Sequence, residues 1–130
     1  MTIYEELLEE AKNSGLVVRE KPLSGSDGRI FRNRIAISDR LRTSTEKACV
    51  LAEEMGHHFT AVGNIIDQMN IENLKQEQKG RLRGYNRMIG LRGIISAFHA
   101  GCQNRYEVAE HLHVTEEYLQ EAIDCYTGKY

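Results

Sequence analysis

The chain has 130 residues, of which 41% are hydrophobic and 28% charged, and its formal net charge is −2. This length suits one domain with a modest core, and the small net charge gives no overall signal for binding nucleic acid or a membrane. The three cysteines are widely spaced and form no C-x-x-C pair, which argues against both a disulfide framework and a thiolate metal site. With neither a signal peptide nor a long apolar run, we expect a cytoplasmic protein without a membrane partner.

The first third of the chain predicts one helix followed by three short strands. Residues 4–13 carry apolar side chains at helical spacing and end at Ser14-Gly15. Strands are predicted at 16–18, 29–31 and 34–37, which are short apolar runs separated by segments that contain proline, glycine or asparagine. We therefore expect a small antiparallel sheet near the N-terminus.

From Thr43 onward the sequence predicts mostly helix, interrupted by a loop over residues 60–70. The first of these helices has a stripe of small and apolar residues that should bury one face: Ala48, Leu51, Ala52 and Met55. Ser44 and Thr45 are candidates to cap its start.

This helix carries the most informative motif, Glu53-Glu54-Met55-Gly56-His57. It is similar to H-E-x-x-H, in which two histidines four apart hold zinc and the glutamate activates a water molecule. Residues four apart share a helix face, so Glu53 and His57 can point at one ion, whereas Glu54 lies about 100° round the helix. The alternative is an amphipathic helix with a charged edge and solvated histidines.

A site of this class needs a third ligand from a second helix, commonly a carboxylate. Residues 73–89 predict such a helix, and Glu77 lies within it. A lone glutamate on a helix is ordinarily just solvated. Glu77 is a candidate ligand only because of the family pattern described next.

The chain resembles the ImmA/IrrE family of metallopeptidases, especially its short phage-type members. The family pattern is H-E-x-G-H followed by E-x-x-A-x-x-F-A, and residues 48–60 resemble the short version A-x-V-L-A-E-E-L-G-H-H-x-T. Glu77, Gly80 and Gly84 fall on the second block, where glycine stands in place of alanine. Arg83 and Gly90 likewise replace the usual aromatic residue and proline, and from these four exchanges we expect a looser second helix.

The resemblance implies that Glu53, His57 and Glu77 are metal ligands and that Glu54 is the general base. It implies one divalent ion, zinc by family default, although two carboxylates and one imidazole also suit manganese or iron. His58 is a candidate to polarise a ligand, but adjacent residues point in different directions, so an ordinary solvated role is favoured. The strand at 35–37 is the expected sheet edge for pairing with an extended substrate.

Residues 105–119 resemble a helix-turn-helix in which Ala109 and Val114 pack and Thr115 caps the second helix. The second helix carries acidic residues and no basic residue before Lys129, so we expect no direct DNA binding by this unit. A basic run precedes the unit and is typical of a solvated helix face. Its members are Lys75, Lys79, Arg81, Arg83, Arg87 and Arg92.

Together these features predict an α+β, minimal zincin-like metalloprotease in one domain, 1–130, with a catalytic core over 1–100 and a helical unit over 101–130. The resemblance implies an endopeptidase that cleaves a helix-turn-helix repressor of a phage or mobile element. The first alternative is a non-catalytic antirepressor that binds such a repressor on a protease scaffold, favoured by the histidine-to-glutamate exchange at Glu53. The second alternative is a DNA-binding regulator.

Overall fold

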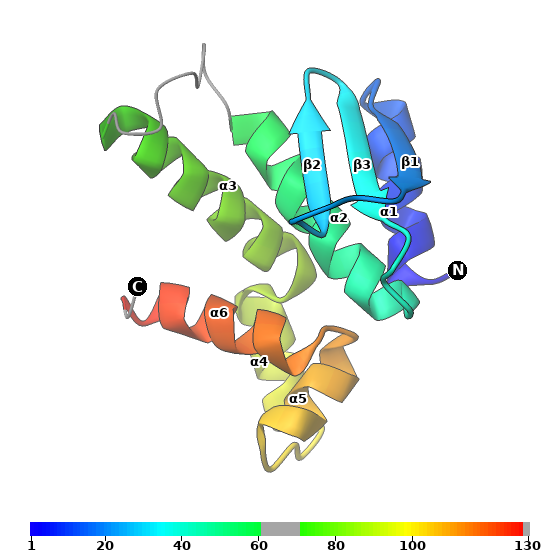
Figure 1. The fold of residues 1–130 in the computed structure, drawn as a ribbon. Coiled ribbons are helices and arrows are strands. Elements are labelled where there is room, and N and C mark those ends of the chain that lie inside the picture. The colour runs from blue at the N-terminus through cyan, green and yellow to red at the C-terminus, as the bar shows by residue number, and fades with distance from the viewer. Residues whose placement is uncertain (61–70, 129–130) are drawn as a thin grey trace.

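The computed structural model describes residues 1–60 and 71–128, with side chains for 1–60 and 78–128. Within them the chain is α+β, as predicted, with a small sheet at one end of the molecule and α4 and α5 at the other (Figure 1). The elements are α1 (Ile3–Asn13), β1 (Val17–Lys21), β2 (Gly28–Phe31), β3 (Arg34–Ser38), α2 (Ser44–Thr60), α3 (Ile71–Met88), α4 (Gly90–His99), α5 (Arg105–Leu112) and α6 (Glu116–Tyr126).

The sheet has the strand order β1-β3-β2 and is mixed. A two-residue turn with Arg32 in the left-handed region joins β2 and β3, which pair antiparallel, whereas β1 pairs with β3 in parallel. The expectations of a purely antiparallel sheet and of an edge at residues 35–37 are therefore wrong. Ile35 and Ile37 are fully buried because β3 is the central strand, and β1 and β2 form the edges.

Helix α2 is the element around which the core is built. It contacts α1, α3, β2 and β3, and its predicted stripe of Ala48, Leu51, Ala52 and Met55 is buried. The cap lies one residue before the predicted ones, because the Thr43 hydroxyl accepts from the Glu46 amide and the Glu46 carboxylate accepts from the Thr43 amide. No helix in the described part of the chain is both long and apolar enough to cross a membrane.

Glycines bring α2 and α3 into unusually close contact. A Cβ atom built on Gly56 would lie 2.1 Å from the Gly80 carbonyl oxygen, and one on Gly84 would lie 3.1 Å from the Ala52 carbonyl oxygen. Real side chains do not tolerate the first distance, so only glycine fits at this crossing. The expectation of a looser second helix is wrong, since these glycines draw the two helices together.

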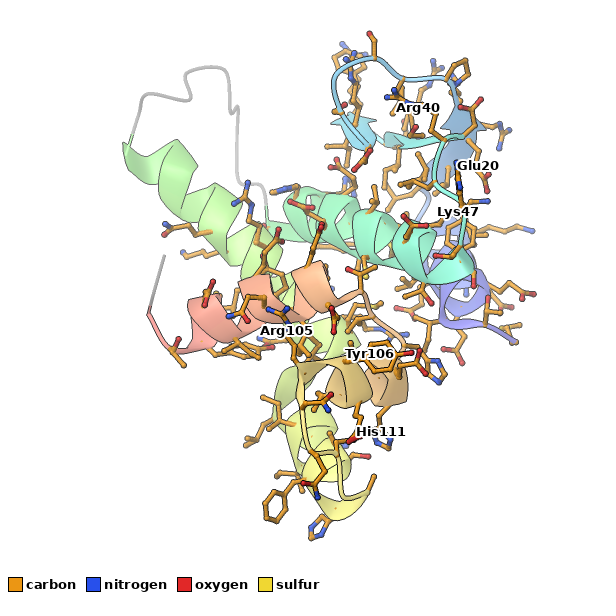
Figure 2. The ribbon with its side chains drawn as sticks, turned by 60° about the horizontal axis from the view of Figure 1, so that its bottom comes forward. Glu20, Arg40, Lys47, Arg105, Tyr106 and His111 are labelled. Atoms are coloured by element: carbon orange, nitrogen blue, oxygen red, sulfur yellow. The ribbon has the colours of Figure 1, made fainter. Side chains whose placement is uncertain are left out.

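The C-terminal unit packs as predicted. Ala109 and Val114 are buried, and the Thr115 hydroxyl accepts from the Tyr118 amide at the start of α6. His113 ends α5 in the left-handed region, with φ of 57°, a position that commonly holds glycine. Figure 2 shows Arg105 on α5, whose guanidinium donates to the Gln120 side chain of α6 at 3.0 Å.

Candidate metal centre

The two candidate ligands on α2 lie close together. His57 Nε2 is 3.9 Å from Glu53 Oε1, across one helical turn. Two ligand atoms of one tetrahedral zinc ion are about 3.4 Å apart, so a small rotation of either side chain brings both within bonding distance of an ion. The His57 side chain is 18% exposed and that of Glu53 38% exposed, so the pair lies at the margin of the core rather than in open solvent.

Arg81 of α3 pairs with the same Glu53 carboxylate. Its Nε atom lies 3.5 Å from Glu53 Oε1. The hydrogen bond to His57 and the charge of Arg81 hold the pKa of Glu53 below its usual range despite partial burial. Glu53 is therefore an anion at neutral pH. The sequence analysis predicts a solvated Arg81, although a spacing of four residues puts it on the same face of α3 as the predicted ligand Glu77.

Helix α3 is packed directly on His57. A Cβ atom built on Gly80 would lie 2.7 Å from His57 Nδ1 and 3.0 Å from its Cα. Glu77 precedes Gly80 by about one turn of α3, but its side chain lies outside the described residues. Among the residues described with side chains, no group of three histidine, cysteine, aspartate or glutamate side chains could hold a metal ion.

The described donors fit part of a divalent-metal shell. One imidazole nitrogen and one carboxylate oxygen at this separation are the ligand types that zinc takes from histidine and glutamate. A complete protein shell requires at least one more donor.

Glu54 faces the sheet, whereas its neighbour Glu53 faces Arg81. Its Cγ atom would lie 3.2 Å from a Cβ atom built on Gly28, the first residue of β2. Glu54 is thus half-buried against the β2 edge while Glu53 turns toward α3. His58 is half-buried, and its ring meets that of Phe59 edge-on with centroids 5.1 Å apart.

The family model of the IrrE N-terminal-like domain, peptidase M78, matches residues 11–124. The chain belongs to this family. No curated protein and no solved structure matches it. Membership in the M78 family indicates a metallopeptidase-family or regulatory role, and it agrees with the resemblance on which the ligand set was predicted.

A pocket of about 140 Å³ opens beside Glu53 in this M78 domain, between α2 and α6. Burial and the nearby Glu53 raise the pKa of Glu121 at its wall. This pocket could not be predicted from the sequence, because α2 and α6 are far apart along the chain. Its acidic lining residues are Asp27, Glu46, Glu53, Glu117 and Glu121.

Proposed function

We propose that the chain is a metal-dependent endopeptidase that cleaves a protein substrate. The observation that carries the proposal is the Glu53–His57 pair on one face of α2, with the α3 backbone packed on His57. By family resemblance, the substrate is a helix-turn-helix repressor of a phage or mobile element. The peptidase family supports the general activity, and the repressor rests on the resemblance alone.

In this proposal Glu53, His57 and Glu77 hold one divalent ion, zinc by family default. When bound, the ion supplies Lewis acidity, which polarises a peptide carbonyl and lowers the pKa of water. Glu54 takes a proton from the attacking water and passes it to the leaving amine. Its position against Gly28 supports this role, because β2 is an exposed sheet edge that an extended peptide can join through backbone hydrogen bonds.

Native mass spectrometry of protein purified without chelator tests the proposal. We expect one ion per chain that is lost in His57→Ala and in Glu77→Ala. His99→Ala is the matched control, because His99 is exposed on α4 and belongs to neither helix of the centre. If the wild-type protein takes up no ion after addition of zinc, manganese or iron, the hydrolase proposal fails.

A non-catalytic antirepressor is the second candidate function. It is favoured by Arg81, since a cation beside Glu53 already partly neutralises the carboxylate that an ion would use. The two functions separate in an assay that follows repressor cleavage and repressor binding in parallel. Cleavage lost in Glu54→Gln with binding kept supports the peptidase, whereas binding without cleavage by the metal-loaded wild type supports the antirepressor.

A further inference from the structure

The face of the sheet that points away from the helices is hollowed and basic. Side chains alternate between the two faces along each strand, and Ile35 and Ile37 of β3 are buried on the helix side. Figure 1 shows α1 and α2 behind the strands and no helix of the described chain in front of them. The outer face lines a hollow of about 230 Å³. No acidic residue lines this hollow, whereas four cations do: Arg19, Lys21, Arg29 and Arg34.

The register of the sheet places these cations on both sides of a groove. Ala36 of the central strand β3 is opposite Arg19 of β1 on one side and opposite Arg29 of β2 on the other. Lys21 lies two residues beyond Arg19 and therefore on the same face of β1. Because neighbouring strands are about 4.8 Å apart, the two rows of cations are roughly 10 Å apart, with a small side chain between them. We call this hollow along β3 the sheet groove.

The positive charge of the sheet groove is not neutralised by the fold. Within the described part of the chain, no carboxylate forms an ion pair with any of its four cations, and all four are exposed. Glu20 of β1 lies on the other face, where it pairs with Lys47 of α2. The whole protein carries a formal net charge of −2, so the groove is a local basic surface on a weakly acidic molecule. Such a groove fits a linear polyanion.

An exposed aromatic ring at one end of the groove favours nucleic acid over other polyanions. Phe31 of β2 is 70% exposed and is opposite Arg34 of β3. The guanidinium carbon of Arg32 lies 5.2 Å from the centroid of the Phe31 ring. Bases stack on aromatic rings and guanidinium planes, while arginine and lysine side chains pair with the phosphates.

An acidic peptide is less well matched to this surface. A peptide that adds to a sheet does so through backbone hydrogen bonds at an open edge. The groove instead follows β3, whose backbone is already paired with β1 and β2. Recognition along the groove therefore depends on side chains alone, as it does for a polynucleotide strand on a sheet face.

We propose that the sheet groove binds single-stranded nucleic acid, with phosphates on its four cations and a base stacked on Phe31. Helix α2 packs on the other face of the sheet, so binding in the groove does not involve the candidate ligands Glu53 and His57. This binding goes beyond the proposed peptidase activity and does not require a bound metal ion.

Fluorescence anisotropy of a labelled oligothymidine of about 12 nucleotides tests the proposal, since this length covers the usual site sizes on small domains. The full chain is titrated from about 1 to 500 μM, the range of non-specific affinities, and oligouridine is titrated alongside. We expect saturable binding of at least one of the two. Binding should weaken with salt, with a slope of log K against log [NaCl] of about −2 for about three phosphate contacts.

Two double variants remove the same net charge from different places. Arg19→Gln with Lys21→Gln takes two cations from the groove and should weaken binding about tenfold or more, with a slope closer to zero by about 1.4. Lys12→Gln with Arg92→Gln is the matched control, because both residues are exposed on α1 and α4, and it should bind like the wild type.

Phe31→Ala tests the stacking separately from the charge. It should weaken binding about fivefold or more and leave the salt slope unchanged, since it removes a ring and no cation. All the substituted side chains are exposed, and circular dichroism checks that each variant is folded.

Polyglutamate at matched charge separates nucleic acid from an acidic protein segment. It should displace the oligonucleotide poorly, because it has no bases to stack on Phe31. Displacement by polyglutamate as efficient as by unlabelled oligonucleotide would overturn the proposal in favour of an acidic peptide. Absence of binding by both oligonucleotides at the highest protein concentration, or equal losses in the two double variants, would also overturn it.

Discussion

Gly80 of α3 lies so close to His57 of α2 that a methyl group at position 80 would meet the imidazole Nδ1 at 2.7 Å and the Cα atom at 3.0 Å. The same crossing holds Gly56, where a methyl group would overlap the Gly80 carbonyl. The candidate ligand on α2 and the helix that carries Glu77 are thus held together by backbone contact, which leaves little freedom for either to move alone.

Gly80→Ala and Gly56→Ala should therefore separate α2 from α3. We expect each to lower the free energy of unfolding by about 1–3 kcal/mol, as overpacking does, and to weaken metal binding. Urea denaturation and metal titration measure the two effects. Gly93→Ala is the control, because its methyl group would lie nearest the end of the flexible Leu112 side chain and in ordinary contact with Ile89. Equal losses of unfolding free energy in all three variants would show that the effect comes from replacing any helical glycine and not from the crossing of α2 and α3.

Arg81→Gln should tighten metal binding. The Arg81 guanidinium shares the Glu53 carboxylate and repels any divalent ion placed there. Because Arg81 is partly exposed and screened by solvent, we expect a gain in affinity on the order of threefold to tenfold by competitive chelator titration. Arg83→Gln serves as the control, since Arg83 lies over the Phe59 ring. A weaker affinity in Arg81→Gln would mean that Arg81 orients Glu53 rather than competing with the ion.

Glu20 of β1 should contribute to stability only above its acidic range. Figure 2 shows Glu20 beside Lys47, whose ammonium is 3.0 Å away, and the Tyr4 hydroxyl donates to the same carboxylate at 2.9 Å. Lys47 first and Tyr4 second lower the pKa of Glu20 in the folded state. The stabilisation is therefore present above the unfolded pKa of about 4.3 and is lost as pH falls through the lower folded pKa.

Glu20→Gln should accordingly destabilise the protein at pH 7 by less than about 1 kcal/mol, because the pair is partly exposed. The difference from wild type should vanish below the folded pKa. Denaturation midpoints measured between about pH 7 and 2.5 check this, a range that spans the ordinary carboxylate pKa. Glu9→Gln, at an exposed position of α1, is the control. A destabilisation that is constant across the pH range would assign the effect to packing instead of charge.

Cys49 should be the slowest thiol of the folded protein to react. Burial raises its pKa to about 11, and the residue is 6% exposed, whereas Cys102 and Cys125 are half-buried. Little thiolate exists at pH 8 at such a pKa. Alkylation followed by peptide mass spectrometry should label Cys102 and Cys125 first and Cys49 only after denaturant is added. Simultaneous labelling of all three in the native state would contradict the packing around α2.

Local sequence pattern was sufficient for the elements but not for their pairing. The buried stripe of α2 was predictable because helical spacing records which face is covered, and the Thr115 cap was predictable because its hydroxyl serves its own helix. The central place of β3 was not, since a run such as Ile35-Ala36-Ile37 shows that a strand is buried without showing which neighbours bury it. Strand order depends on contacts between distant segments.

The candidate site divides in the same way. The closeness of Glu53 and His57 follows from their spacing on one helix, so the sequence alone predicted it. Arg81 lies beside Glu53 because glycines allow α2 and α3 to cross closely. Sequence reasoning does not predict this, since glycine within a helix ordinarily indicates low helix propensity and does not show that another helix contacts it. The role of Glu77 stays a prediction, because its side chain is outside the described residues.

Helix α2 supplies two of the three candidate ligands and also forms the middle of the core, so metal binding and folding are thermodynamically linked. Any ion that Glu53 and His57 bind only in the folded state adds RT ln(1 + [ion]/Kd) to the unfolding free energy, about 2.7 kcal/mol at a hundredfold excess over Kd. The melting temperature of the whole protein therefore reports metal binding. A chelator should lower the melting temperature. The cation that raises the melting temperature most, at matched concentration, is the preferred metal, and this measurement requires no substrate.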